Sequence, residues 1–191
     1  EGALQWTRIW GTVTNEEAWA VSLDTSDNIF VSGHTRGSVD GQVYAGGGDG
    51  YLAKFSPDGT RTWSRMWGSA TTENGNAAVV DIVGSAYVLG NTDGEFDGQT
   101  NAGDEDFYLA KHSSSGTREW SRIWGSSLND TSPGGTICDS SGHVYACGMT
   151  QGAFDNETAI GNGDLCLTKW VDNPDSDSDG LPDAWEITCF G

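Results

Sequence analysis

The sequence predicts an all-β, propeller-type protein made of three four-stranded antiparallel blades and a short C-terminal calcium loop. Three observations lead to this fold class. The 191-residue chain repeats itself every 57 residues or so, as Trp6 and Trp63 show (63 − 6 = 57). Each repeat contains short runs of alternating apolar and polar residues that are separated by turn sequences. Glycine occurs 28 times and tryptophan nine times, which suits tight turns and large buried rings.

The repeat is clearest at a tryptophan-rich segment. The strings WTRIWG, WSRMWG and WSRIWG begin at Trp6, Trp63 and Trp120. A second marker, YLAK, begins at Tyr51 and Tyr108, and returns as CLTK at Cys166. Because separate markers keep the same phase, each copy should be one structural unit.

Each unit should fold as four short strands. In the first unit we expect them over about residues 18–24, 28–33, 51–55 and 61–68. The sequence SPDG at 56–59 places Pro and Gly where a tight turn needs them. A four-stranded antiparallel unit with this repeat length is typical of a propeller blade. The blades are therefore expected over about residues 17–68, 75–125 and 134–171, inside a repeat region of residues 1–171 that precedes a separate segment, 172–191.

The third blade is one strand short. The fourth-strand sequence first occurs at residues 3–11, ahead of any blade, and no copy of it follows Trp170. The strand at 3–11, with Trp6, Arg8 and Trp10, is therefore expected to complete the third blade. It can do so within its own chain, closing a small ring, or in a neighbouring copy, giving a ring or a filament. The remaining alternative is that the sequence is a fragment of a longer protein.

These markers resemble the SBBP repeat of bacterial β-propellers, which has a G-x-DxYLxK-like strand, a turn and a W-x-x-x-x-G strand. The resemblance covers roughly residues 1–171. It implies a propeller-type fold in an extracytoplasmic prokaryotic setting, and it brings no catalytic residues. Members of that family usually carry more than three blades, and this chain departs from them there.

The segment DSDSDGLPDAWE at 175–186 matches the calcium-loop pattern D-x-D-x-D-G-x5-E. Hard oxygen ligands at this density suit Ca²⁺. The expected ligands are the side chains of Asp175, Asp177, Asp179, Asp183 and Glu186 and the backbone carbonyl of Leu181. The segment is similar to the calcium loops of thrombospondin type 3 and dockerin-like repeats, which implies a structural Ca²⁺ at the exit of the propeller. The alternative is an acidic linker without fixed structure.

Charged residues also recur inside the blades. Two acidic series, in the long loops and before the YLAK strands, can hold further cations or cap turns: Asp40, Asp97 and Asp155, and Asp49, Asp106 and Asp164. Eight of the nine basic residues stand at repeated positions: Arg8, Arg65, Arg122, Lys54, Lys111, Lys169, Arg61 and Arg118. They form either a ring of cations for a ligand or a set of side chains that pack on tryptophans and pair with acidic loops.

The four cysteines lie in the third blade and the tail. We expect disulfides Cys138–Cys147 and Cys166–Cys189, with Cys147–Cys166 as the main alternative. Asn129 and Asn156 begin N-x-T sequons and are candidate glycosylation sites. Disulfides and sugars both fit an oxidising, extracellular location.

Charge and motifs narrow the function. Nine basic against 28 acidic residues give a net charge of −19, which argues against nucleic acid as a partner. No apolar run is long enough for membrane insertion, and no G-x-S-x-G, H-E-x-x-H or Walker-type loop points to an enzyme. We therefore expect a secreted, non-enzymatic, calcium-stabilised structural protein whose partner is itself. The alternatives are a glycan- or protein-binding module, with Tyr44 as a candidate contact, and a fragment or accessory domain of a larger secreted enzyme.

Overall fold

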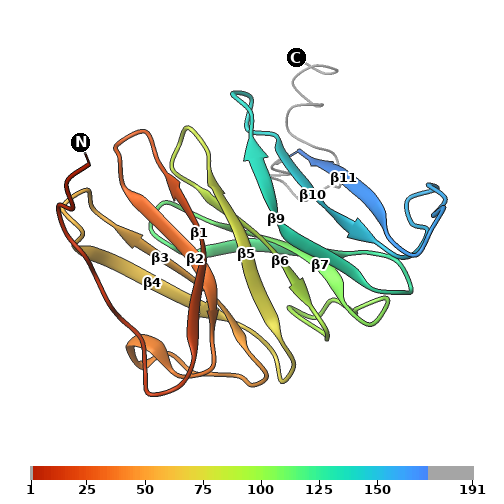
Figure 1. Cartoon of the computed structure of the whole chain (residues 1–191), viewed down its shortest axis with the longest axis horizontal. Coiled ribbons are helices and arrows are strands. Elements are labelled where there is room, and N and C mark those ends of the chain that lie inside the picture. The colour runs from red at the N-terminus through yellow and green to blue at the C-terminus, as the bar shows by residue number, and fades with distance from the viewer. Residues whose placement is uncertain (1, 172–191) are drawn as a thin grey trace, which may run out of the picture.

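The computed structural model describes residues 2–171, and the structural statements below refer to that range. Eleven strands within it pair into three antiparallel sheets, and the one helical element is a single 3-10 turn, η1 (Val39–Gly41). The all-β prediction is therefore confirmed, whereas the sheets do not close into a ring within this range (Figure 1). No helix among these residues has the length and apolar character needed to cross a bilayer.

The sheets follow one another along the chain, each with its strands in sequential order. The first contains β1 (Glu16–Leu23), β2 (Ile29–Thr35), β3 (Asp49–Phe55) and β4 (Arg61–Trp67). The second contains β5 (Glu73–Val80), β6 (Ala86–Thr92), β7 (Asp106–His112) and β8 (Arg118–Trp124). The third contains β9 (Asp130–Cys138), β10 (Val144–Thr150) and β11 (Asp164–Trp170) and has no fourth strand.

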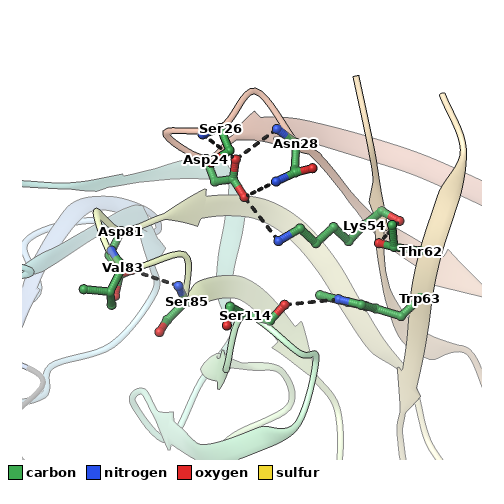
Figure 2. A network of polar contacts seen from close by, with 10 residues as sticks. All are labelled: Asp24, Ser26, Asn28, Lys54, Thr62, Trp63, Asp81, Val83, Ser85 and Ser114. Carbon is green, nitrogen blue, oxygen red and sulfur yellow. Dashed lines mark hydrogen bonds and ion pairs between the residues drawn. The ribbon is translucent and has the colours of Figure 1, made fainter. Parts of the chain in front are cut away.

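An aspartate fixes the first hairpin of every sheet. The Oδ1 atom of Asp24 accepts hydrogen bonds from the backbone N–H of Ser26 and Asn28, both at 2.9 Å. Asp81 does the same in the second sheet (Figure 2), and Asp139 in the third. A side chain that accepts from the backbone two and four residues later closes a tight turn, so the repeat encodes each hairpin locally.

A glycine near the end of the second strand lets two strands approach closely. A Cβ atom on Gly90 would lie 1.7 Å from the carbonyl oxygen of Asn74 and 2.5 Å from the ring of Tyr108. The β5–β6 register shifts at this point, between Asn74 and Ala77. Gly33 occupies the same place in the first sheet, where a Cβ would lie 1.8 Å from a backbone oxygen. The recurring glycine of the FVSG and YVLG segments therefore serves this contact.

The three sheets pack face to face in a row, with the first and third at opposite ends (Figure 1). One hydrophobic core lies between the first and second sheets and includes Phe30, Leu52 and Val88. Another lies between the second and third and includes Leu109 and Val144. We call the face of a sheet that points to the next sheet its downstream face, such as the Leu109 side of the second sheet. The opposite face is the upstream face, such as the Val88 side of the same sheet.

The predicted closure of the third blade within one chain is wrong. Residues 3–11 form no strand and lie along the upstream face of the first sheet, where Trp10 packs on Phe55. The third sheet lies at the other end of the row (Figure 1). A strand needs a partner for its backbone hydrogen bonds, and this segment has none within the described part of its own chain.

Candidate functional site

The contact between the first and second sheets shows how a fourth strand joins two neighbouring sheets. From β4, Arg65 donates from Nε to the carbonyl oxygen of Gly116 at 2.8 Å and from Nη2 to that of Ser115 at 3.0 Å. Trp63 donates from Nε1 to the carbonyl oxygen of Ser114 at 3.2 Å (Figure 2). Strand β4 therefore binds the turn that follows β7 in the next sheet.

The N-terminal segment makes the same contact with the first sheet. Arg8 donates from Nε to the carbonyl oxygen of Gly59 at 2.8 Å and from Nη2 to that of Asp58 at 2.8 Å. Arg8 precedes Arg65 by 57 residues (65 − 8 = 57), and Gly59 precedes Gly116 by the same interval (116 − 59 = 57). The segment therefore stands against the first sheet as β4 stands against the second.

Ring packing supports this equivalence independently. In each repeat, the last tryptophan of the W-x-x-x-W segment packs on the last residue of the third strand of the following sheet. The three pairs are Trp10–Phe55 at 4.9 Å, Trp67–His112 at 4.8 Å and Trp124–Trp170 at 4.8 Å between ring centroids. Residues 6–10 consequently occupy the place of the fourth strand of a preceding sheet, although the described chain contains no such sheet.

Strand β11 is the complementary open edge. In the first two sheets, the third strands pair with β4 and β8, whereas β11 pairs only with β10. Leu165 and Leu167 on β11 are 98% and 72% exposed, while Leu109 at the equivalent position of β7 is 0% exposed. Unpaired backbone groups on an edge are a template for another strand, and exposed leucines add apolar surface to it.

The aspartates before the YLAK strands cap the preceding loops. The backbone N–H of Ala45 donates to Asp49 at 2.9 Å, that of Ala102 donates to Asp106 at 2.5 Å, and that of Ile160 donates to Asp164 at 2.7 Å. This is the arrangement of the turn-capping alternative. Among residues 2–171, no three histidine, cysteine or acidic side chains come together as a metal-binding group.

Two of these aspartates also face a carboxylate of the next sheet. Asp49 lies near Glu73, and Asp106 near Asp130, all four with 0% exposure. Burial raises the pKa of Asp49, Glu73 and Asp106, and the charge of Asp130 raises that of Asp106 further. A Cβ at Gly125 would lie 2.4 Å from the nearest oxygen of Asp106, so the glycine after the W-x-x-x-W segment makes room for the pair.

The other member of each pair escaped the sequence analysis, although the signal was present. Glu16, Glu73 and Asp130 open the first strand of their sheets at intervals of 57 residues (73 − 16 = 130 − 73 = 57). Glu16 is half-buried and has no third-strand aspartate beside it in the described chain. Burial acts to raise its pKa, but hydrogen bonds from Thr12 and neighbouring threonines outweigh this and lower it.

The acidic residues of the long loops pair with the fourth strand of their own sheet. Asp40 accepts from Nη2 of Arg61 at 2.5 Å and from the hydroxyl of Ser64. Asp97 accepts from Arg118 at 2.5 Å and from a serine in the same way. Asp155 adopts the same positive φ, near +51°, but the described third sheet has no fourth strand to supply such partners. Thr7 stands 57 residues before Ser64 and carries the equivalent hydroxyl (64 − 7 = 57).

The predicted Cys138–Cys147 disulfide is wrong. Cys138 lies opposite Val144, and Cys147 lies three residues further along the same strand, so their side chains point to opposite faces of the sheet. Cys166 lies opposite Gly148, which places it on the other face from Cys147 and excludes that pairing too. All three thiols are free, and burial raises the pKa of Cys166 to about 11. Cys189 lies outside the described residues, so Cys166–Cys189 remains a prediction.

The remaining candidate positions are distributed elsewhere. Asn129 is half-buried beside β9, Asn156 is exposed in the loop before β11, and Tyr44 is half-buried. The calcium-loop ligands lie outside the described residues: Asp175, Asp177, Asp179, Leu181, Asp183 and Glu186. No family model matches this chain, and no curated protein matches it.

Proposed function

We propose that this protein is a secreted, non-enzymatic structural unit that assembles with copies of itself by strand addition. Residues 3–11 of one copy would become the fourth strand of the third sheet of another copy. One observation carries this proposal: the N-terminal segment makes the Arg8 and Trp10 contacts of a fourth strand in the absence of the sheet to which such a strand belongs.

The internal repeats supply the pairing register. Leu52 on β3 lies opposite Arg65, and Leu109 on β7 lies opposite Arg122. Transferred by the repeat to β11, this register places Leu167 opposite Arg8 of the incoming strand. The same transfer places Cys166 opposite Ile9 and Lys169 opposite Trp6.

Two features favour this association energetically. Each net backbone hydrogen bond contributes on the order of 0.5–1.5 kcal/mol, and an added strand forms several of them along β11. The donor segment is also partly ordered before it binds, because Arg8 and Trp10 already hold it against the first sheet. Preorganisation reduces the entropy lost on association.

The assembly would be supported outside the cell by calcium. The proposed ion binds the loop at 175–186, where five carboxylates within twelve residues would otherwise repel one another. Extracellular calcium modules bind with dissociation constants of roughly 10⁻⁴–10⁻³ M, which suits that environment. The high acidic charge and the SBBP-like repeat favour the same location.

A cysteine in the donor strand tests the register. Directly opposed residues of an antiparallel pair have Cα atoms about 4.5–5.5 Å apart, within the range of a disulfide. Ile9→Cys should therefore form a disulfide with Cys166 of a neighbouring copy under mild oxidation, seen as covalent oligomers on a non-reducing gel. Val13→Cys, which also exposes a thiol but lies beyond the strand, should form far fewer.

The control is the double variant Ile9→Cys/Cys166→Ser, which should lose the oligomers. Strand addition at β11 is wrong if this double variant crosslinks as well as Ile9→Cys does. Deletion of residues 2–11 offers a separate check, since it should leave a soluble chain that no longer associates in light scattering.

A further inference from the structure

We propose that the joint between copies is a complete sheet-on-sheet interface, in which the downstream face of the third sheet packs on the upstream face of the first sheet of another copy. The occupant of both exposed faces is thus a second copy of this chain. This inference rests on the proposed strand addition and extends it from an edge to a surface.

The downstream face of the third sheet exposes side chains whose equivalents are buried. Leu165 and Leu167 are 98% and 72% exposed, and Ile137 on the same face is 64% exposed. In the second sheet, Phe107 and Leu109 hold the positions of the two leucines and are 2% and 0% exposed. The difference arises because a third sheet covers the second, whereas no sheet within residues 2–171 covers the third.

The upstream face of the first sheet is exposed in a matching way. Val21 and Leu23 on β1 are 68% and 55% exposed. Ala78, which follows Val21 by 57 residues, is 9% exposed because it packs against the first sheet. Residues 8–10 cover only the other side of this face, around Phe55. The incoming copy would thus meet a surface that already carries its own fourth strand.

Side-chain sizes on the two faces compensate for each other. Cys147 stands where the second sheet has Leu89, so the downstream face of the third sheet has less volume there. On the upstream faces, Ile29 stands where the third sheet has Val144, so the first sheet offers more. A smaller residue opposite a larger one preserves the packing of a joint between sheets.

The joint would also repeat the carboxylate pair of the internal joints. Asp164 begins β11 as Asp106 begins β7, and Glu16 begins β1 as Asp130 begins β9. Docking two copies would therefore bring Asp164 near Glu16. Replacing one carboxylate by an amide of the same shape should remove repulsion from the joint while still accepting the capping hydrogen bonds from Ile160 and Gly161.

Two variants of the full-length protein test the surface. Leu167→Glu places a charge in the proposed interface and should weaken association at least tenfold, as measured by light scattering over a dilution series. Val83→Glu is the matched control, because Val83 is 74% exposed in a turn of the second sheet; it should leave association unchanged. Asp164→Asn should strengthen association at neutral pH several-fold, whereas Asp104→Asn, the same change in an exposed loop of the second sheet, should not.

The outcomes separate this inference from the strand addition beneath it. If Ile9→Cys still crosslinks to Cys166 but Leu167→Glu associates like the parent protein, strand addition stands and the surface joint is wrong. If Ile9→Cys gives no specific crosslink, the proposed function itself fails. If Leu167→Glu lowers the melting temperature of the dissociated chain, residues 172–191 of the same chain cover the face, and the proposal is overturned.

Discussion

Two equivalent leucines should differ sharply in what they contribute to stability. Leu109 and Leu167 occupy the same position in the second and third sheets, yet Leu109 is 0% exposed and Leu167 is 72% exposed. Truncation of a buried leucine costs about 2–5 kcal/mol, so Leu109→Ala should lower the free energy of unfolding by that amount. In the dissociated chain, Leu167→Ala should change it by only about 0.5 kcal/mol.

The assembled protein should reverse this contrast for Leu167. Complete burial of a leucine side chain contributes about 1.5–3 kcal/mol, and most of this side chain is still exposed before association. We therefore expect Leu167→Ala to cost about 1–2 kcal/mol per joint. Since 1.4 kcal/mol corresponds to a factor of ten, the dissociation constant should rise by roughly 5- to 30-fold.

Two assays separate these effects. Urea unfolding followed by tryptophan fluorescence, at a concentration low enough for dissociation, reports the stability of the single chain. Light scattering over a dilution series reports association. Equal unfolding costs for Leu109→Ala and Leu167→Ala would refute the reasoning, because the third sheet would then be covered within one chain. A Leu167→Ala variant with unaltered association would refute the joint.

Three further predictions concern the described sheets and the tail. Gly90→Ala should lower the urea midpoint by the equivalent of about 2 kcal/mol or more, since its Cβ would lie 1.7 Å from a backbone oxygen, while Gly161→Ala should have little effect; similar midpoints would contradict this. Asp106→Asn should raise the melting temperature at pH 7, because the raised pKa of Asp106 makes its charged form costly in the folded state. This advantage should shrink as the pH falls through that raised pKa and the parent carboxyl becomes protonated, so a difference independent of pH would argue against it. Chelation by EGTA should expose residues 172–191 to protease, and an unchanged cleavage pattern would count against the calcium loop.

The strands of the described sheets could be predicted because their signals are local. The expected strands at 51–55 and 61–68 correspond to β3 (Asp49–Phe55) and β4 (Arg61–Trp67). Alternating apolar residues specify a half-buried strand, and Asp or Pro-Gly turn sequences specify where it reverses. The repeat then transfers each local assignment to the other sheets, which explains why the all-β class and the strand order within sheets were accessible.

The failures arose where the answer depends on another strand. Whether residues 3–11 form a strand is decided by an acceptor edge, and no pattern within those residues reveals where that edge lies. The Cys138–Cys147 prediction failed because separation along the chain says nothing about faces. One residue of register moves a side chain to the other side of a sheet. The carboxylate pairs of the joints likewise link residues of different sheets, and only the phase of the repeat connects them.

The number of sheets per copy limits the forms that the proposed assembly can take. A ring made of whole copies must contain a multiple of three sheets, because each described chain supplies three. Propellers typically have four to eight blades, and six is the one multiple of three in that range. A closed ring should therefore contain two copies and have a mass of 40.4 kDa (2 × 20.2). If the rotation at each joint does not close after six sheets, the same heterologous contact must continue into a filament. Light scattering and images of the native particle distinguish these forms, and a mass of 20.2 kDa at every concentration would rule out both.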